Sequence, residues 1–167
     1  MTSSRDAQLK KLAAEFGLDI AEHIRAVPRH EVAVEHGGQL FVSGQIPRVR
    51  GAVAVAGSVG ADVSLEEGCR AARICVVRAL IVARQSLGSL DRVAKVLRMN
   101  VYVHSAANFT EQSEVADAAS EILYTLLEPH GGHTRTAVGV HQLPKNASVE
   151  LDLLVALGEA EAGPSTF

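Results

Sequence analysis

The stretch from residue 65 to residue 87 constrains the fold most, because it encodes one long amphipathic helix. Ser64 and Glu67 have the spacing of a capping box, in which the two side chains bind the free N–H groups at the helix start. Gly88 is the residue type that most readily ends a helix. Apolar residues recur at helical spacing throughout and form one stripe: Leu65, Cys69, Ala72, Val76, Ala79, Leu80, Ala83 and Leu87. Such a stripe needs an equally long apolar surface to cover.

Four arginines of this helix lie largely off the apolar stripe: Arg70, Arg73, Arg78 and Arg84. An anion-binding face is one explanation of the pattern. A solvated helix face is much the commoner one, and we expect it here.

Strand patterns lie on both sides of the helix. Residues 31–36 and 39–45 predict a hairpin around Gly37-Gly38, and residues 52–56 are a weaker candidate strand. Further strands are predicted at 95–104, 135–141 and 148–156. In 95–104 the apolar set is Leu97, Met99, Val101 and Val103, which alternates with the polar set Arg98, Asn100, Tyr102 and His104.

Two more helices complete the pattern, at residues 4–16 and at residues 111–128 before Pro129. We predict a single α/β (α+β) domain over residues 1–167, with two long helices on one face of a mixed sheet. Its parts are an N-terminal helix and loop (1–29), a core (30–157) and a tail (158–167). The second sheet face, expected to carry Arg135, His141, Glu150 and Asp152, would be covered by association into a homotrimer.

Composition excludes several function classes. The net charge of −3 and the 4% of aromatic residues, with no clustered Lys and Arg, do not fit a nucleic-acid partner. No apolar run is long enough to cross a bilayer, and the polar start is not a secretory signal, so we expect a cytoplasmic protein with no membrane partner. Cys69 and Cys75 are six residues apart on one helix, too far for an unstrained disulfide, and we expect buried thiols.

Arg135 and Glu150 are the strongest candidates for chemistry. A guanidinium can grip both oxygens of a carboxylate, and a glutamate can orient or deprotonate a water molecule. If the strands that carry them are neighbours, the two side chains would flank one cleft. The alternative is an Arg–Glu ion pair that only joins strands, and structural pairs of this kind are common.

Other polar residues are weaker candidates. His130, His133 and His141 lack the ligand spacing of a metal site, so no metal is expected. Ser43 follows a strand but lacks the Gly-x-Ser-x-Gly elbow of a nucleophile. Asp117, in a small-residue helix face, has the pattern of a solvated helix position.

Three segments together resemble the RidA/YjgF family, in a longer-chain branch. Leu40-Phe-Val-Ser-Gly-Gln-Ile-Pro47 is similar to its strand signature. The helix region of the family is similar to two stretches taken together, Gly60-Ala-Asp-Val-Ser-Leu-Glu-Glu-Gly68 and Leu90-Asp-Arg-Val93. The run from Arg135 to Glu150 resembles the C-terminal signature of the family. Some relatives are labelled endoribonucleases of the L-PSP type. The ordered set covers about residues 30–157.

The resemblance implies a chorismate-mutase-like fold, a trimer around a central barrel and clefts between subunits. It also implies hydrolysis of 2-imino acids and enamines to 2-keto acids and ammonia, a deaminase activity that needs no cofactor. Arg135 matches the carboxylate-binding arginine, Glu150 the water-positioning glutamate, and Gly44, next to Ser43, a backbone contact to the ligand.

The cleft lining departs from the family pattern at His30, Asp117 and Ala137, which replace a tyrosine, an asparagine and a small thiol residue. Asp117 beside a bound carboxylate would repel it unless it is protonated or turned away. Two functions therefore stay open: a hydrolytic deaminase, and a non-catalytic trimer that binds small metabolites.

Overall fold

The computed structural model describes residues 4–25 and 29–158. Three helices, seven strands and two short 3-10 turns follow one another in this described part of the chain. Their order is α1 (Arg5–Glu15), β1 (Ala33–His36), β2 (Gln39–Gln45), β3 (Arg48–Val49), β4 (Ala52–Val53), α2 (Leu65–Leu87), η1 (Leu90–Arg92), β5 (Val93–His104), α3 (Gln112–Leu126), β6 (Thr134–Val140), η2 (Pro144–Asn146) and β7 (Val149–Leu157).

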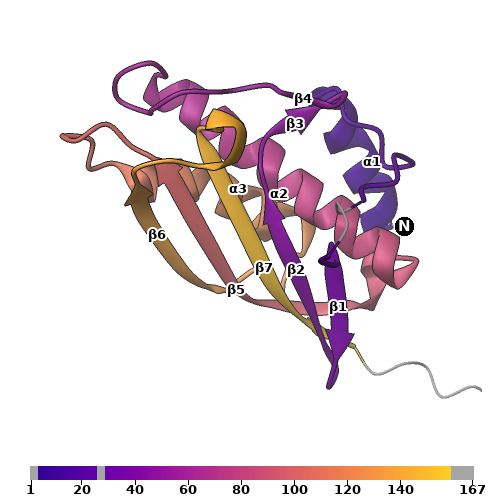
Figure 1. Ribbon diagram of the computed structural model, residues 1–167. Coiled ribbons are helices and arrows are strands. Elements are labelled where there is room, and N and C mark those ends of the chain that lie inside the picture. The colour runs from indigo at the N-terminus through magenta and orange to yellow at the C-terminus, as the bar shows by residue number, and fades with distance from the viewer. Residues whose placement is uncertain (1–3, 26–28, 159–167) are drawn as a thin grey trace, which may run out of the picture.

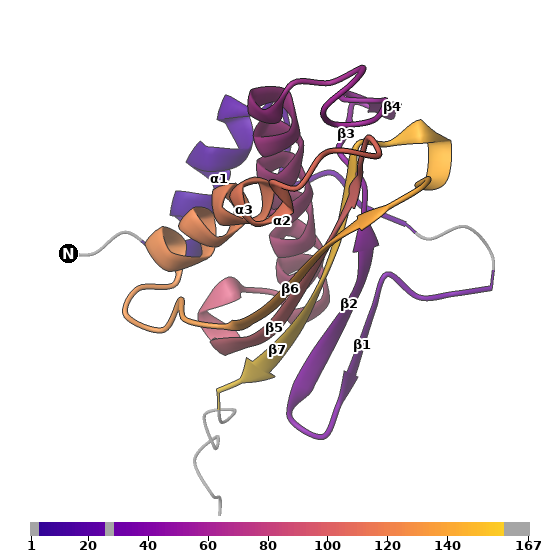
Figure 2. The ribbon, with the colours of Figure 1, turned by 90° about the vertical axis from the view of Figure 1, so that its left-hand side faces the viewer.

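The main sheet has the strand order β1-β2-β7-β5-β6 and is mixed, because only β5 and β6 run parallel. All three helices cover the same face of it, and the other face is open (Figures 1 and 2). This confirms the predicted single mixed sheet with helices on one side. Strands β3 and β4 form a separate two-stranded ribbon. The weak strand expected at 52–56 is thus only Ala52–Val53, and its partner β3 was not predicted.

Helix α2 has the predicted bounds and the predicted cap. Ser64 accepts a hydrogen bond from the Glu67 backbone N–H, while the Glu67 carboxylate accepts one from the Ser64 backbone. Its burial is wider than one stripe, because the sheet packs on one side and α1 and α3 on the other (Figure 2). Among the four arginines expected on a solvated face, Arg70 is exposed, but Arg78 is buried. The prediction is therefore wrong for Arg78.

The register of the strands fixes which side chains meet the helices. Met99 and Val101 of β5 and Leu151 and Leu153 of β7 lie in the core, as predicted. Between Val96 and Arg98 the β5–β7 register shifts, so that Val96 rather than Leu97 is buried.

One residue assigned to the open face lies on the other face, and another is buried rather than exposed. Arg135 is paired with Met99 across the parallel β5–β6 ladder and therefore lies on the helix face of the sheet. His104 is buried at the end of β5, where the Val59 backbone N–H donates to its carbonyl. For Arg135 this corrects the predicted face, because an alternation pattern assigns side chains to two faces without knowing the partner strand.

The turn between α3 and β6 comes shortly before Arg135 and packs closely against the backbone of α3. A Cβ added at Gly131 would overlap the backbone of Tyr124 and lie 2.6 Å from the Leu123 carbonyl oxygen. At Gly132 the nearest atom would be the Tyr124 hydroxyl, at 3.8 Å. We predict that Gly131→Ala lowers the free energy of unfolding by about 1–3 kcal/mol, since the backbone must move to relieve the overlap. Gly132→Ala is the matched control, and equal urea midpoints for the two variants would contradict this.

Candidate functional site

The predicted site residues form two separate groups in the chain. The first is the β6 cluster, which consists of Arg135, Asp117, Ser120 and His133. Arg135 extends from β6 toward α3, where its Nη1 donates to Asp117 Oδ1 at 2.6 Å and to Ser120 Oγ at 3.0 Å. The ion pair expected as an alternative between Arg135 and Glu150 is therefore replaced by one with Asp117.

A short chain of hydrogen bonds holds this cluster. His133 Nδ1 lies 2.8 Å from the Gly131 carbonyl oxygen, so this nitrogen carries the proton and donates. His133 Nε2 then accepts from the Ser120 hydroxyl, at 3.0 Å. The Ser120 oxygen remains free to accept from Arg135. Ser120 did not stand out in the sequence, and His133 was considered only as a metal ligand, because their contact depends on how α3 lies over the end of β6.

Asp117 is 60% exposed and neutralises Arg135 in the free chain. A ligand carboxylate that binds the guanidinium must therefore share it with Asp117 or displace it. Ala137, two residues along β6, faces the same side and packs at the edge of the core. Its side chain carries no polar group, so Ala137 can contribute only to the shape of the surface beside Arg135.

The second group lies where β2 ends and surrounds a cavity of about 290 Å³, which we call the β2 cleft. Its walls include four of the predicted site residues, His30, Ser43, Gly44 and Glu150. The remaining lining residues are Ile24, Arg25, Val32, Gln45, Ile46, Arg48, Arg78 and Pro144.

Glu150 lies directly against the backbone of Gly44. A Cβ added at Gly44 would overlap Glu150 Oε1 and come within 3.0 Å of its carboxyl carbon. A register shift between Val42 and Gln45 places this glycine opposite β7. A glycine is therefore needed at position 44, because the Glu150 carboxyl group occupies the space of a side chain.

Burial raises the pKa of Glu150 above its ordinary value, and the nearby Asp152 carboxylate raises it further. Asp152 is itself held by the Asn100 amide, at 2.8 Å. A glutamate with a raised pKa accepts a proton more readily near neutral pH than an ordinary one. This direction of the pKa shift makes Glu150 a candidate general base.

Ser43 and His30 have smaller roles in the cleft. The Ser43 hydroxyl donates to the Glu31 carbonyl at 2.6 Å, which ties β2 to the segment before β1. His30 is exposed at the rim. Neither arrangement supports a nucleophile, in agreement with the missing elbow motif.

Arg78 is the functional candidate that sequence reasoning placed wrongly. It is 7% exposed and donates from Nη1 to the Arg48 carbonyl at 3.1 Å, while its Nε has no hydrogen-bond partner among the described residues. One signal was available: Arg78 is the single charged residue in the run Ile74 to Ala83. A helix segment that is apolar all round is buried, and so is a charge within it.

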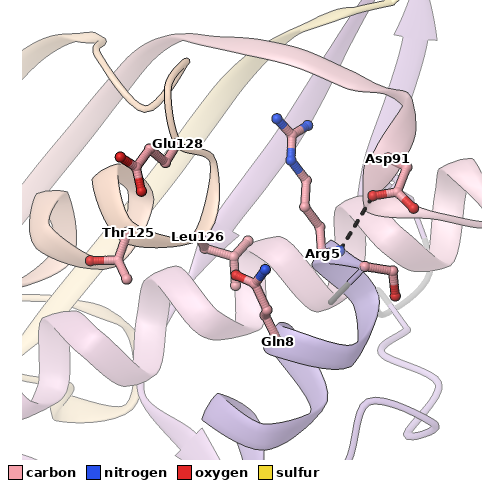
Figure 3. A pocket seen from close by; sticks show the side chains of 7 residues that line it. Arg5, Gln8, Asp91, Thr125, Leu126 and Glu128 are labelled. Carbon is pink, nitrogen blue, oxygen red and sulfur yellow. Dashed lines mark hydrogen bonds between the residues drawn. The ribbon is translucent and has the colours of Figure 1, made fainter. Parts of the chain in front are cut away.

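A cavity of about 500 Å³ lies elsewhere, between the start of α1 and the end of α3 (Figure 3). Its charged lining residues are Arg5, Asp91 and Glu128, and Arg5 Nη1 donates to the Val93 carbonyl at 2.6 Å. None of the predicted site residues lines this cavity. Its size alone does not make it a site.

The described residues contain no group of three or more His, Cys, Asp or Glu side chains that could hold a metal ion. Within that same part of the chain, no helix has the length and apolarity needed to cross a membrane. Both cysteines are free thiols; Cys75 is buried as expected, whereas Cys69 is only partly covered.

A family model described as "YjgF/chorismate mutase-like, putative endoribonuclease" matches residues 10–157. The chain belongs to the YjgF/RidA family. Its helix-covered mixed sheet is the chorismate-mutase-like fold of that family.

Individual relatives agree with this assignment. Protein TCP17 of Trypanosoma cruzi is 45% identical over 122 residues, which cover 72% of this chain and 76% of the relative. The crystal structure of Atu1372 from Agrobacterium tumefaciens, a protein of unknown function, matches with a TM-score of 0.81 and 35% identity over 92% of this chain and 94% of that one. A Shewanella oneidensis protein described as a putative endoribonuclease matches with a TM-score of 0.83 and 25% identity, over 93% and 100% of the two chains.

The raised pKa of Glu150 has a measurable consequence for stability. Because the folded state holds the Glu150 proton more tightly than the unfolded state, ionisation of this group costs stability as the pH rises through its ordinary and then its raised pKa. We predict that Glu150→Gln is more stable than wild type at about pH 7 and that the gain shrinks toward about pH 4. Urea unfolding at both pH values measures this, with Glu128→Gln, an exposed position, as control. A gain that is larger at the acidic pH would show that the carboxylate is stabilised by the fold.

Proposed function

We propose that this YjgF/RidA-family protein is a homotrimer that binds small 2-keto and 2-imino acids between subunits and hydrolyses the imines to 2-keto acids and ammonia. The observation that carries the proposal is Glu150, a base with a raised pKa that lies against the Gly44 backbone in a cleft lined by arginines. Family membership supports the proposal, and so do the open sheet face and the separation of the two groups of site residues.

The open face of the sheet supports the trimer. Val34, Phe41 and Val138 are 49%, 48% and 40% exposed, and the register places all three on this face. Leu154 and Tyr102 lie between them on β7 and β5. Exposed apolar groups gathered on one face mark a surface that associates, and three copies can close it around a common axis.

The two groups of site residues support a site shared between subunits. Arg135 lies on the helix face of β6, whereas Glu150 lies on the open face of β7, with β5 between the two strands. Two strand spacings separate them by roughly 10 Å across the sheet, before the offset along the strands and the opposite faces are added. A small ligand cannot contact both residues of one chain. A neighbouring copy has to supply the second group.

In the reaction that we propose, Arg135 binds the ligand carboxylate and Glu150 takes a proton from a water molecule. The resulting hydroxide adds to the carbon of the C=N bond, and the nitrogen gains a proton. The carbinolamine then loses ammonia as its hydroxyl proton is removed, and the C=O bond of the keto acid forms. Water and imine thus become keto acid and ammonia, with no redox step and no cofactor.

One observation favours the second candidate function, a trimer that binds metabolites without catalysis. Arg135 is already paired with the exposed Asp117 at 2.6 Å, so the ligand carboxylate meets a competing charge. An endoribonuclease activity has less support, since the described residues that line the β2 cleft include no Phe, Tyr or Trp side chain on which a base could stack.

The test of activity is a coupled assay. An amino-acid oxidase generates 2-imino acids, and the release of ammonia is followed with and without the protein. We expect faster release with wild type and a loss of most of that acceleration with Glu150→Gln, which removes the base but keeps the shape of the side chain. Unchanged release with wild type, together with measurable binding of keto acids, would decide for the non-catalytic function.

For the assembly, we predict a homotrimer by light scattering at micromolar concentration. Phe41→Glu places a charge on the open face and should shift the protein toward monomers, because a buried unpaired carboxylate is costly. Ala14→Glu, on the exposed side of α1, is the control and should leave the mass unchanged. A wild-type monomer would contradict the shared site as well as the trimer.

For the proposed contact between Arg135 and the ligand carboxylate, we predict that Arg135→Ala weakens the binding of 2-keto acids by roughly ten- to a hundredfold. This factor corresponds to the free energy of one hydrogen bond between charged groups. Asp117→Asn should strengthen the binding, because the guanidinium loses a competing anion. Calorimetric titration compares both variants with Arg92→Ala, because Arg92 and its partner Glu35 line neither the β2 cleft nor the cavity beside Asp117. Equal affinity of Arg135→Ala and wild type would remove Arg135 from the site.

A further inference from the structure

The β2 cleft has more positive charge than a single carboxylate base requires. Arg25, Arg48 and Arg78 all line it, against Glu150 as its acidic wall. Arg78 comes from α2, beneath the end of β2. Its side chain is buried, whereas Arg25 is exposed. A buried guanidinium is an unusual lining for a cavity that otherwise binds only a water molecule and an imine.

Arg78 is incompletely satisfied in the free chain. Its hydrogen bond goes to the neutral carbonyl of Arg48, and its Nε has no partner among the described residues. Within those residues it forms no ion pair, although the exposed carboxylate of Glu22 is close enough to act on it electrostatically. Burial also lowers its pKa, which shows that the charge is poorly solvated. A cation in such a place gains much from a bound anion.

We propose that the inner end of the β2 cleft, at Arg78 and Arg48, binds a second anionic group of the ligand, so that the preferred ligand is a dicarboxylic 2-keto or 2-imino acid. The inference rests on the proposed function, because Arg135 of another subunit holds the first carboxylate. The second carboxylate enters from the side of Glu150 and meets the two arginines below it. The reacting carbon then lies between the anchors, beside Glu150.

Cleft size and charge agree with this ligand class. A volume of about 290 Å³ is at the lower end of the range for small-ligand sites and suits a metabolite of a few carbons. A ligand with one carboxylate and an alkyl tail would bury that tail against guanidinium groups and leave Arg78 without an anion. A dicarboxylate pairs both charges.

The experiment is a calorimetric titration of the full-length protein with 2-oxoglutarate and with 2-oxopentanoate. The two probes have equal carbon number and differ in the second carboxylate. We expect wild type to bind 2-oxoglutarate at least tenfold more tightly. Arg78→Gln should bring the two affinities to within about twofold, whereas Arg70→Gln, at an exposed position on the same helix, should keep the preference.

Arg48→Gln provides a second variant if Arg78→Gln does not fold, because its side chain is only half-buried. We expect it to reduce the preference as well. A purely structural role of Arg78 would weaken both probes equally, and that result would overturn the inference. So would wild type that binds both probes alike.

The two proposals can fail separately. If wild type binds both keto acids alike and Arg135→Ala weakens both, the shared carboxylate site stands and the second anion site is wrong. If wild type binds neither probe, both proposals are wrong.

Discussion

The packing of α2 between the sheet and the two other helices is the constraint on which the rest of the structure depends. Fourteen of its 23 residues are buried, including the unbroken run from Ile74 to Ala83. The run contacts β7 and β2 on one side and α3 and α1 on the other. The central strands must therefore present an apolar face toward α2, and their polar residues are left to the opposite face. Glu150 and Asp152 reach the open face because Leu151 and Leu153 are required below.

The same constraint explains which parts of the fold were predictable. Helix α2 has a cap, a stripe and a terminal glycine, and its bounds were found without error. The alternation in β7 fixed the faces of Glu150 and Asp152, since each neighbour belongs to the core. For β6 the prediction was wrong, because that edge strand has no such alternation and its face depends on the parallel register with β5. That register is a long-range property, because α3 separates the two strands in the sequence.

The candidate site also combines residues that the local sequence identifies with contacts that depend on the folded chain. Gly44 and Glu150 were identified from local sequence similarity, and they meet because β2 and β7 are adjacent. Arg135 and Asp117 were identified in the same way, but their ion pair could not be, since α3 meets β6 only in the folded chain. Arg78 was missed for a different reason. A single stripe was assumed for α2, whereas a helix enclosed by a sheet and two helices buries nearly its whole circumference.

Three charged residues of the two groups of site residues are in part compensated within their own chain. Arg135 has Asp117, Glu150 has a raised pKa that favours its neutral form, and Arg78 has a backbone carbonyl. Compensation of this kind lets the chain fold before any ligand is bound, because no isolated buried charge has to be carried alone. It also affects the affinity for a ligand, since each compensating contact competes with the ligand. A ligand that replaces several of them at once, in geometry that two subunits hold fixed, loses less to that competition than one that replaces a single contact. The arrangement therefore selects for the number and spacing of the ligand's charges more than for its apolar surface.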